Sequence, residues 1–398
     1  MIQAQNPTPE VKRPVAVVGV GQTQNRSHWD RSLPALYRLA ASNAIEDAQL
    51  GWSDLQAVVF GHSPEYFEGV NAPEKWCAEA VGAYGLPTFR IHTGGTVGGS
   101  TAIAAYYMVA SGLFDVVLAT SGNKLGDCAH AQIGLSTVYD PILGRSFAAG
   151  AIGAVAIQSQ EYIHLHGATE QHAAQVAVKA RTNALRNPNA HLKIEGYSTE
   201  QALASPMLST PLRLSDCCPQ SDSACALIFC SEEKARELAG PAAWVRSAVA
   251  VSEGVNYTDR EWSKPIALRK AAEMAYERAG ITNPREQLDV VELYDAFTYQ
   301  ELIWSEGLGL ADWGGGIELL ESGATAMDGD IPINPSGGVL SANSIGASAM
   351  IRKAEAAMQV MGKAGDHQIP DVQWSLGHGW GGAIQFHTIM IFSKEMGA

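Results

Sequence analysis

Residues 289–310 read DVVELYDAFTYQELIWSEGLGL, and this stretch carries the clearest structural pattern in the chain. An apolar run rich in valine ends at Tyr294 and Asp295, and a helical pattern follows. An Ala-rich helical pattern over residues 271–279 precedes the run. Helices on both sides of a buried strand are typical of an α/β protein whose sheet is covered on both faces.

An earlier segment repeats this arrangement, with an Ala-rich helical pattern over residues 40–48 leading into the apolar run QAVVFG. The positions align in order: Ala44 with Ala275, Ala48 with Ala279, and Val58 with Val290. The ends of the two regions also match, as ALIFCSEEKA against IMIFSKE. Internal similarity of this kind predicts a duplicated fold. We expect two similar halves, residues 1–240 and 241–398, with an inserted loop domain at about residues 122–212 that has no counterpart in the second half.

Short apolar runs alternate with helical patterns along the whole chain, as expected for layered α/β architecture. The strand candidates are Pro14–Val20, Ala57–Phe60, Val116–Thr120, Ala224–Cys230, Ala243–Val251, Val290–Leu293, Val372–Leu376 and Ile384–Phe392.

Composition excludes several classes of protein. The chain of 398 residues is 46% hydrophobic and 17% charged, which is too apolar and too weakly charged for a disordered protein. Its 41 acidic and 27 basic residues give a net charge of −14, which argues against a nucleic-acid partner. The low charged fraction favours a large core or a large subunit interface.

The cysteine pattern and the chain's apolar stretches point to the cytoplasm. The six cysteines form no C-x-x-C pair, so neither a disulfide framework nor a zinc ribbon is expected. Residues 1–14 lack the apolar region of a signal peptide. Residues 91–114 hold no formal charge, but they begin with the Gly-rich sequence HTGGTVGGST after Ile91. A buried helix is therefore a better interpretation than a membrane span, and we expect none.

Four junctions, three of them Gly-rich, follow strands or open helices and offer places for chemistry, since a free helix N-terminus can stabilise an oxyanion or enolate. They are HTGGTVGGST (92–101), VELYDAF (291–297), NPSGGVLSANSIG (334–346) and SLGHGWGG (375–382).

The order of these motifs resembles the thiolase superfamily, especially its sterol-carrier-protein-type branch. VELYDAFTYQELIWSEGLGL resembles the branch segment that contains His-Asp-Cys-Phe, and NPSGGVLSANSIGAS resembles the segment N-x-x-G-G-x-x-x-G-H-P-x-G-A-S. SDCCPQSDSACALIF is similar to the strand that ends the first half of a thiolase. The resemblance covers essentially the whole chain and implies a five-layer α-β-α-β-α fold with duplicated halves and an inserted loop domain.

The chain departs from the thiolase pattern at the residues that carry acyl transfer. Thr96 stands where the resemblance implies the nucleophilic cysteine, and Asn343 stands where it implies the activating histidine. Tyr294 replaces the histidine of His-Asp-Cys-Phe. A threonine hydroxyl needs an adjacent base to act as a nucleophile, so a covalent acyl-enzyme is not expected. The resemblance places Cys217 and Cys218 away from the nucleophile helix.

The resemblance is greatest to lipid-transfer-protein-like aldolases of steroid side-chain degradation, which lack the thiolase cysteine and use a tyrosine in the YD-[AS]-F segment. It implies a lyase that cleaves a β-hydroxyacyl-CoA by a retro-aldol step to a ketone and a short acyl-CoA such as propionyl-CoA or acetyl-CoA. That branch has a second catalytic tyrosine close to the position of Ser344, which is absent here, so we assign His378 as its substitute.

The candidate catalytic residues are Tyr294 and His378 for proton transfer, Asn343 as an oxyanion donor and Asp295 as an orienting group. The glycines beside His378 predict an accessible side chain. Purely structural roles also remain open: Tyr294 could anchor a loop through its hydroxyl, and Asn343 could cap a helix that starts near Ser344. The candidate substrate-binding residues are Thr96 as a pocket wall, His92, Gly95, Gly338, Ser344 and Tyr299.

The resemblance further implies a homodimer, and a partner protein with an OB-fold and a zinc ribbon that forms a heterotetramer. We expect no metal or cofactor in this chain; coenzyme A belongs to the substrate, and zinc only to the partner. Two other functions stay open: a thiolase or acyltransferase with an atypical site, and a non-catalytic subunit that binds acyl-CoA or acts as a scaffold.

Overall fold

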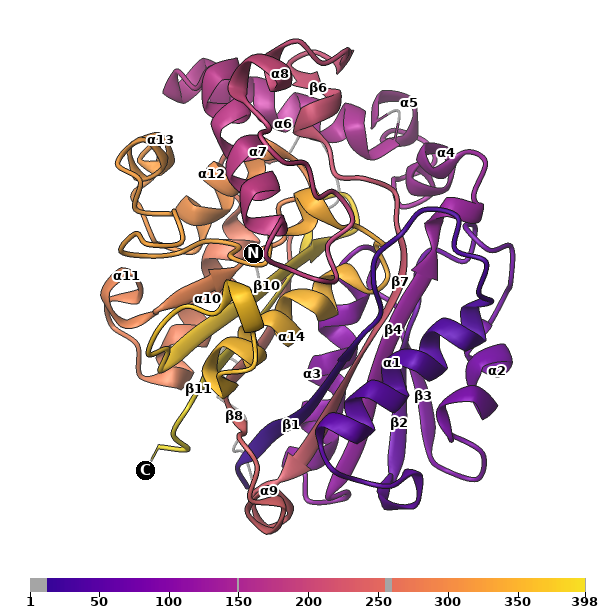
Figure 1. The fold of residues 1–398 in the computed structure, drawn as a ribbon. Coiled ribbons are helices and arrows are strands. Elements are labelled where there is room, and N and C mark those ends of the chain that lie inside the picture. Colours follow the sequence, from indigo (N-terminus) through magenta and orange to yellow (C-terminus); the bar gives the residue numbers. More distant parts are fainter. Residues whose placement is uncertain (1–12, 149, 255–259, 398) are drawn as a thin grey trace.

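The computed structural model describes residues 13–148, 150–254 and 260–397. Within these residues the main sheet has nine strands in the order β3-β2-β4-β7-β1-β8-β11-β10-β9 (Figure 1). The strands are β1 (Val15–Gln22), β2 (Ala57–Gly61), β3 (Thr88–Ile91), β4 (Val116–Lys124), β7 (Asp222–Ser231), β8 (Ala243–Ser252), β9 (Val290–Glu292), β10 (Trp374–Gly381) and β11 (Phe386–Ser393). A separate hairpin pairs β5 (Met207–Ser209) with β6 (Leu212–Arg213).

Strand order and direction repeat in the two halves of the sheet. In the first half β2 is parallel to β3 and β4, and β7 is antiparallel to β4 and β1. In the second half β9 is parallel to β10, and β11 is antiparallel to β10 and β8. A parallel bridge between Val291 and Ile333 takes the place of the β2–β3 pair. The halves meet where Ala16 and Val17 of β1 pair with Trp244 and Ala243 of β8.

Helices complete a layered structure of the predicted type. Helix α1 (Leu33–Asp47) covers the outer face of the first half, and α10 (Ile266–Ala279) covers that of the second. Helices α3 (Val97–Ala110) and α14 (Ser348–Met361) pack against each other between the halves. Their backbones approach closely because residue 98 is glycine, where a Cβ would lie 2.7 Å from the Met350 nitrogen. The predicted duplicated α/β fold is thus confirmed.

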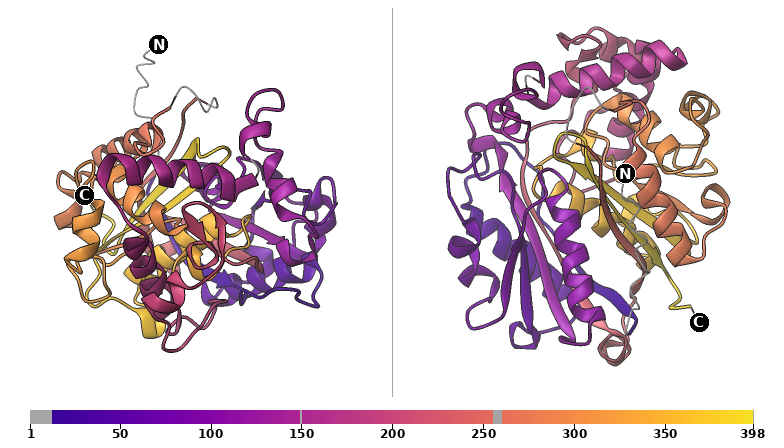
Figure 2. Two further views of the ribbon diagram at one scale, coloured as in Figure 1. Left: turned by 90° about the horizontal axis from the view of Figure 1, so that it is seen from above. Right: turned by 180° about the vertical axis from the view of Figure 1, so that it is seen from behind.

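The segment between β4 and β7 lies above the strand ends of both halves, drawn in magenta in Figure 1 and seen again from behind in Figure 2. It corresponds to the insertion predicted at about residues 122–212. Its helices are α4 (Ala131–Ser136), α5 (Arg145–Ala148), α6 (Gly150–His166), α7 (Glu170–Ala184) and α8 (Thr199–Leu203). The other helices are α2 (Pro73–Cys77), α9 (Glu232–Leu238), α11 (Pro284–Gln287), α12 (Thr298–Gly307) and α13 (Gly316–Glu321).

The strand predictions miss β3 and the short β5–β6 hairpin, and they end β10 too early. Strand β3 was not predicted, because its sequence TFRI is short and partly exposed at the edge of the sheet. Strand β10 continues through the predicted Gly-rich junction as far as Gly381. The N-terminal stretch without a signal-peptide pattern falls largely on residues 1–12, outside the described residues. In the described part of the chain, no helix combines the length and apolar character needed to cross a membrane.

Candidate active site

A cavity of about 370 Å³ lies where the second half meets the inserted segment. Residues after β9, the loop before α14, the end of β10 and the start of α3 form its floor. The inserted segment supplies most of its remaining wall. The lining residues are Gly95, Leu125, Ala131, Gln132, Leu135, Val138, Tyr139, Ala151, Ile152, Leu208, Leu214, Cys217, Cys218, Pro219, Gln220, Tyr294, Ala296, Phe297, Asn343, Ile345, Trp380, Gly381 and Gly382. Three sequence-predicted residues, Gly95, Tyr294 and Asn343, are therefore brought together here.

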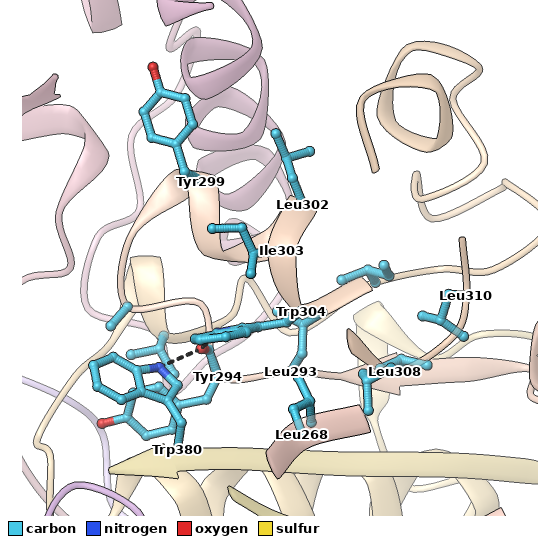
Figure 3. Packing of buried hydrophobic residues seen from close by; sticks show 14 of the residues in the cluster. Leu268, Leu293, Tyr294, Tyr299, Leu302, Ile303, Trp304, Leu308, Leu310 and Trp380 are labelled. Atoms are coloured by element: carbon cyan, nitrogen blue, oxygen red, sulfur yellow. Dashed lines mark hydrogen bonds between the residues drawn. The ribbon is translucent and has the colours of Figure 1, made fainter. Parts of the chain in front are cut away.

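Tyr294 follows the end of β9 and is fixed at its backbone. Its carbonyl oxygen accepts hydrogen bonds from Trp304 Nε1 at 2.9 Å and Trp380 Nε1 at 3.0 Å. The Trp380 ring lies edge-on to the phenol with centroids 5.7 Å apart, and Figure 3 shows the two side chains together. The phenol is only 3% exposed, and burial raises the pKa of Tyr294 well above its usual value. Tyr294 is therefore a neutral phenol with a proton to donate.

The Asn343 side chain has a defined orientation. Its Oδ1 accepts hydrogen bonds from the Ile345 nitrogen at 3.0 Å and Ser348 Oγ at 2.8 Å. Its Nδ2 donates to Cys218 Sγ at 2.9 Å. Tyr294 Oη makes a third and longer contact with Oδ1, at 3.4 Å. Because two shorter bonds already occupy Oδ1, the long bond from Tyr294 is the weakest of the three and can be exchanged for one to a bound ligand.

Cys218 lines the cavity, as does Cys217; the resemblance implied only that both lie away from the helix that begins after Thr96. The Cys218 backbone nitrogen donates to the Ala296 carbonyl at 2.9 Å, and Cys217 forms a bridge with Phe297. These contacts hold the end of the inserted segment against the residues that follow Tyr294. Burial raises the pKa of the Cys218 thiol to about 12. The sequence did not predict this placement, because the residues around Cys217 and Cys218 do not indicate that their backbone pairs with a segment about 80 residues further along the chain.

His378 does not line the cavity, and the predicted accessibility of its side chain is corrected by the structure. It is 0% exposed within β10. The neighbouring glycines serve the approach of α14 instead: a Cβ on Gly377 would lie 2.8 Å from the Arg352 oxygen, and one on Gly379 would lie 2.8 Å from the Ala349 Cβ.

The His378 ring supports Tyr294 from behind. Its Nδ1 accepts a hydrogen bond from the Tyr294 backbone nitrogen at 3.4 Å, so its proton belongs on Nε2, which faces His387 Nδ1 at 3.1 Å. Burial and the neighbouring His387 hold the pKa of His378 well below its usual value. Burial and Arg260 lower the pKa of His387 to about 3. Both rings are therefore neutral, and His378 positions the backbone of Tyr294.

Asp295 is buried beside the cavity rather than in its wall. Its Oδ1 accepts a hydrogen bond from the Val339 nitrogen at 2.7 Å, whereas Oδ2 is buried without a partner. Gly338 fits against this carboxyl with φ +66°, and a Cβ there would lie 2.4 Å from Asp295 Oδ1. Burial and the nearby Glu301 raise the pKa of Asp295 to about 7.

This pKa predicts how pH affects stability. An unfolded Asp titrates near pH 3.9, so between about pH 4 and pH 7 the folded chain keeps a proton that the unfolded chain loses. Asp295 therefore makes stability fall as pH rises through that window. Asp295→Asn, which retains the acceptor for Val339, should remove this fall. Urea unfolding of both proteins across this range measures it; parallel pH profiles would contradict the assignment.

The remaining predicted substrate-binding residues lie outside the cavity wall. Thr96 is fully buried, with its hydroxyl 2.6 Å from Thr388 Oγ1, so it is not the expected pocket wall. The His92 side chain is 47% exposed and lies 3.6 Å from Glu65. Ser344 accepts a hydrogen bond from Ser223 at 2.8 Å.

Tyr299 also lies outside the wall. Its hydroxyl is buried without a hydrogen-bond partner, and Figure 3 shows it pointing away from Tyr294. Gly338 lies against Asp295 and is also absent from the cavity wall. Of the six predicted substrate-binding residues, Gly95 is therefore the one that lines the cavity.

A duplicated layered fold whose cavity lies between strand ends and the start of the buried α3 defines the thiolase class. Residues 249–394 match the family described as thiolase C-terminal domain-like. Acetyl-CoA acetyltransferase of Methanothermobacter thermautotrophicus is 31% identical over 96% of this chain and 100% of that protein. Human sterol carrier protein 2 is 27% identical over 94% of this chain and 72% of that protein. The solved Ltp2-ChsH2(DUF35) aldolase is similar with a TM-score of 0.84 and 26% identity, covering 97% of this chain and 99% of that one.

The chain therefore belongs to the thiolase superfamily, in its sterol-carrier-protein-type branch. The relatives' names include both acyltransferase and aldolase, so family membership leaves the reaction open.

Proposed function

We propose that this protein is a thiolase-fold aldolase that cleaves a β-hydroxyacyl-CoA by a retro-aldol reaction. The observation that carries the proposal is the neutral Tyr294 phenol, whose hydroxyl lies in the wall of an apolar cavity and makes a long hydrogen bond of 3.4 Å to Asn343 Oδ1. The likeness to the Ltp2-ChsH2(DUF35) aldolase supports it.

One tyrosine suffices for the proton transfers of this reaction. The two proton transfers are concerted. As the Cα–Cβ bond breaks, Tyr294 gives its proton to the α-carbon while its oxygen takes the β-hydroxyl proton, so the products are a ketone and a shortened acyl-CoA, and Tyr294 ends as the neutral phenol it began as. The backbone N–H of Gly95, at the start of α3, is suited to donate to the thioester oxygen.

The cavity wall indicates a bulky, apolar acyl group. Most lining side chains are aliphatic or aromatic, and the polar groups at its floor gather near Tyr294. A steroid with a shortened side chain meets this description. Incubating the chain, with and without its partner, with a 17-hydroxy steroid acyl-CoA should release a ketone and a short acyl-CoA. No turnover with the partner present would contradict the proposal.

Acyl transfer remains a second candidate because the Cys218 thiol lines the same cavity. Against it, the thiol is held protonated by burial, and among the hydrogen bonds of the described residues none joins a histidine ring to it. A thiolate nucleophile requires a lowered pKa or an adjacent base.

Cys218→Ser separates the two reactions. Serine can still accept the Asn343 hydrogen bond, so aldol cleavage should stay within about tenfold of wild type, since a single neutral hydrogen bond contributes about 1 kcal/mol. Acyl transfer through Cys218 would instead be lost. Steady-state rates and intact-protein mass spectrometry during turnover measure this; an acyl adduct on Cys218 would establish acyl transfer.

We further propose a cytoplasmic homodimer that works with a second protein of OB-fold and zinc-ribbon type, which would hold the zinc. The edge strand β3 exposes Phe89, and Trp76 and Tyr84 are exposed near it in the sequence, which suits a subunit interface. The related aldolase is named for two components, Ltp2 and ChsH2. Light scattering of the chain alone and with the partner tests both assemblies.

A further inference from the structure

A polar side chain stands in the otherwise apolar part of the cavity wall. Gln132 of α4 lines the cavity. The wall around it, contributed by the inserted segment, consists largely of Leu135, Val138, Ala151, Ile152 and Leu208. The catalytic groups proposed above come from other elements, so the proposed chemistry at Tyr294 does not use Gln132.

The orientation of the Gln132 amide is determined by its contacts. Its Oε1 accepts hydrogen bonds from the backbone nitrogens of Ala151 at 2.9 Å and Ile152 at 3.5 Å, at the start of α6. A flipped amide would set its NH₂ group against these N–H donors. Gly150 permits the close approach: its φ is +84°, and a Cβ there would lie 2.5 Å from Gln132 Oε1.

This orientation leaves the Gln132 Nε2 donors unused. In the described part of the chain, no hydrogen bond is made by Nε2, although Oε1 makes two. When a bulky ligand displaces the water around such an N–H donor, the donor loses its hydrogen bonds to water. This loss weakens binding unless the ligand supplies a hydrogen-bond acceptor.

We propose that Gln132 Nε2 forms a polar subsite for a hydrogen-bond acceptor, a ketone or hydroxyl oxygen on the apolar body of the acyl group. This inference rests on the proposed function for the acyl-CoA nature of the ligand and adds a determinant of specificity. An acyl group without that oxygen leaves the amide donor unpaired, so the subsite selects oxygenated ring systems over hydrocarbon ones.

Binding of uncleavable ligands tests the subsite separately from catalysis. Two ring-containing acyl-CoA thioesters without a β-hydroxyl are compared, one with a ketone on the ring system and one without. Titration calorimetry on the full-length wild-type chain should show about tenfold tighter binding of the ketone. Equal affinities of the wild-type chain for the two thioesters would overturn the proposed subsite. A failure to detect aldol cleavage would contradict the proposed function but not the subsite, because this experiment measures binding alone.

The matched variant is Gln132→Glu. Its carboxylate still accepts from Ala151 and Ile152, and a negative charge suits a helix N-terminus, but the donor to the ligand is gone. The preference for the ketone should disappear. Gln220→Glu adds the same charge elsewhere in the cavity wall and should keep the preference. If both variants lose the preference, added charge explains the effect and the assignment to Gln132 is overturned.

Discussion

Tyr294→Phe is expected to lower kcat for β-hydroxyacyl-CoA cleavage by about 100-fold or more, the usual range for loss of a proton-transfer group. The ring packing against Trp380 remains, and both indole hydrogen bonds go to the backbone carbonyl, which the substitution keeps. The loss should therefore appear in kcat with little change in unfolding temperature. Steady-state kinetics and thermal unfolding of the same preparation measure the two effects.

Tyr299→Phe is the matched control for this experiment. Its hydroxyl is buried without a partner and lies outside the cavity wall, so its removal should leave kcat within about twofold and stability unchanged or slightly higher, because no hydrogen bond is lost. Unchanged kcat in Tyr294→Phe, or equal losses in both variants, would remove Tyr294 from the mechanism.

Arg352→Met is expected to give the largest loss of stability. Arg352 of α14 is 2% exposed, pairs with Glu292 of β9 and donates to Ser336 Oγ at 2.7 Å. Removing one partner of a buried ion pair strands the other, which costs about 3–5 kcal/mol. The pair joins α14 to β9, the strand that leads to Tyr294, so its loss should also reduce the yield of active protein.

The loss should depend on pH. Arg352 opposes the effect of burial, which raises the pKa of Glu292. Without Arg352, the folded chain holds a proton on Glu292 that the unfolded chain releases above its pKa of about 4.3, so stability falls as pH rises above that value. Urea unfolding at pH 5 and pH 8 should show the larger deficit at pH 8.

Arg236→Met provides the control for the ion pair. Arg236 contacts Glu232 at 2.8 Å on an exposed helix, with 60% of its side chain accessible, so its loss should change stability by less than about 1 kcal/mol. A similarly small change in Arg352→Met, or one independent of pH, would show that the buried pair contributes little to the fold.

The layered α/β fold could be predicted from the amino-acid sequence. The Ala-rich helical patterns near Ala44 and Ala275 became α1 and α10, which cover equivalent faces of the two halves. Each of these patterns is local, because the periodicity of a helix or a strand can be recognised within a few turns or a few residues. The positions where strands end can then be predicted from where the periodicity stops. Tyr294 could be placed at a strand end for the same reason.

The side chains that share the cavity with Tyr294 come from distant segments, and the sequence did not predict which of them meet. Cys218 reaches Asn343 because its backbone pairs with Ala296, and Gln132 is oriented by the start of α6. Conversely, the glycines beside His378 accommodate α14 and bury the imidazole that they were expected to expose. Contacts between distant segments depend on how whole layers of helices and strands pack. The residues that meet in this way show no periodic pattern in the sequence from which the contact could be predicted.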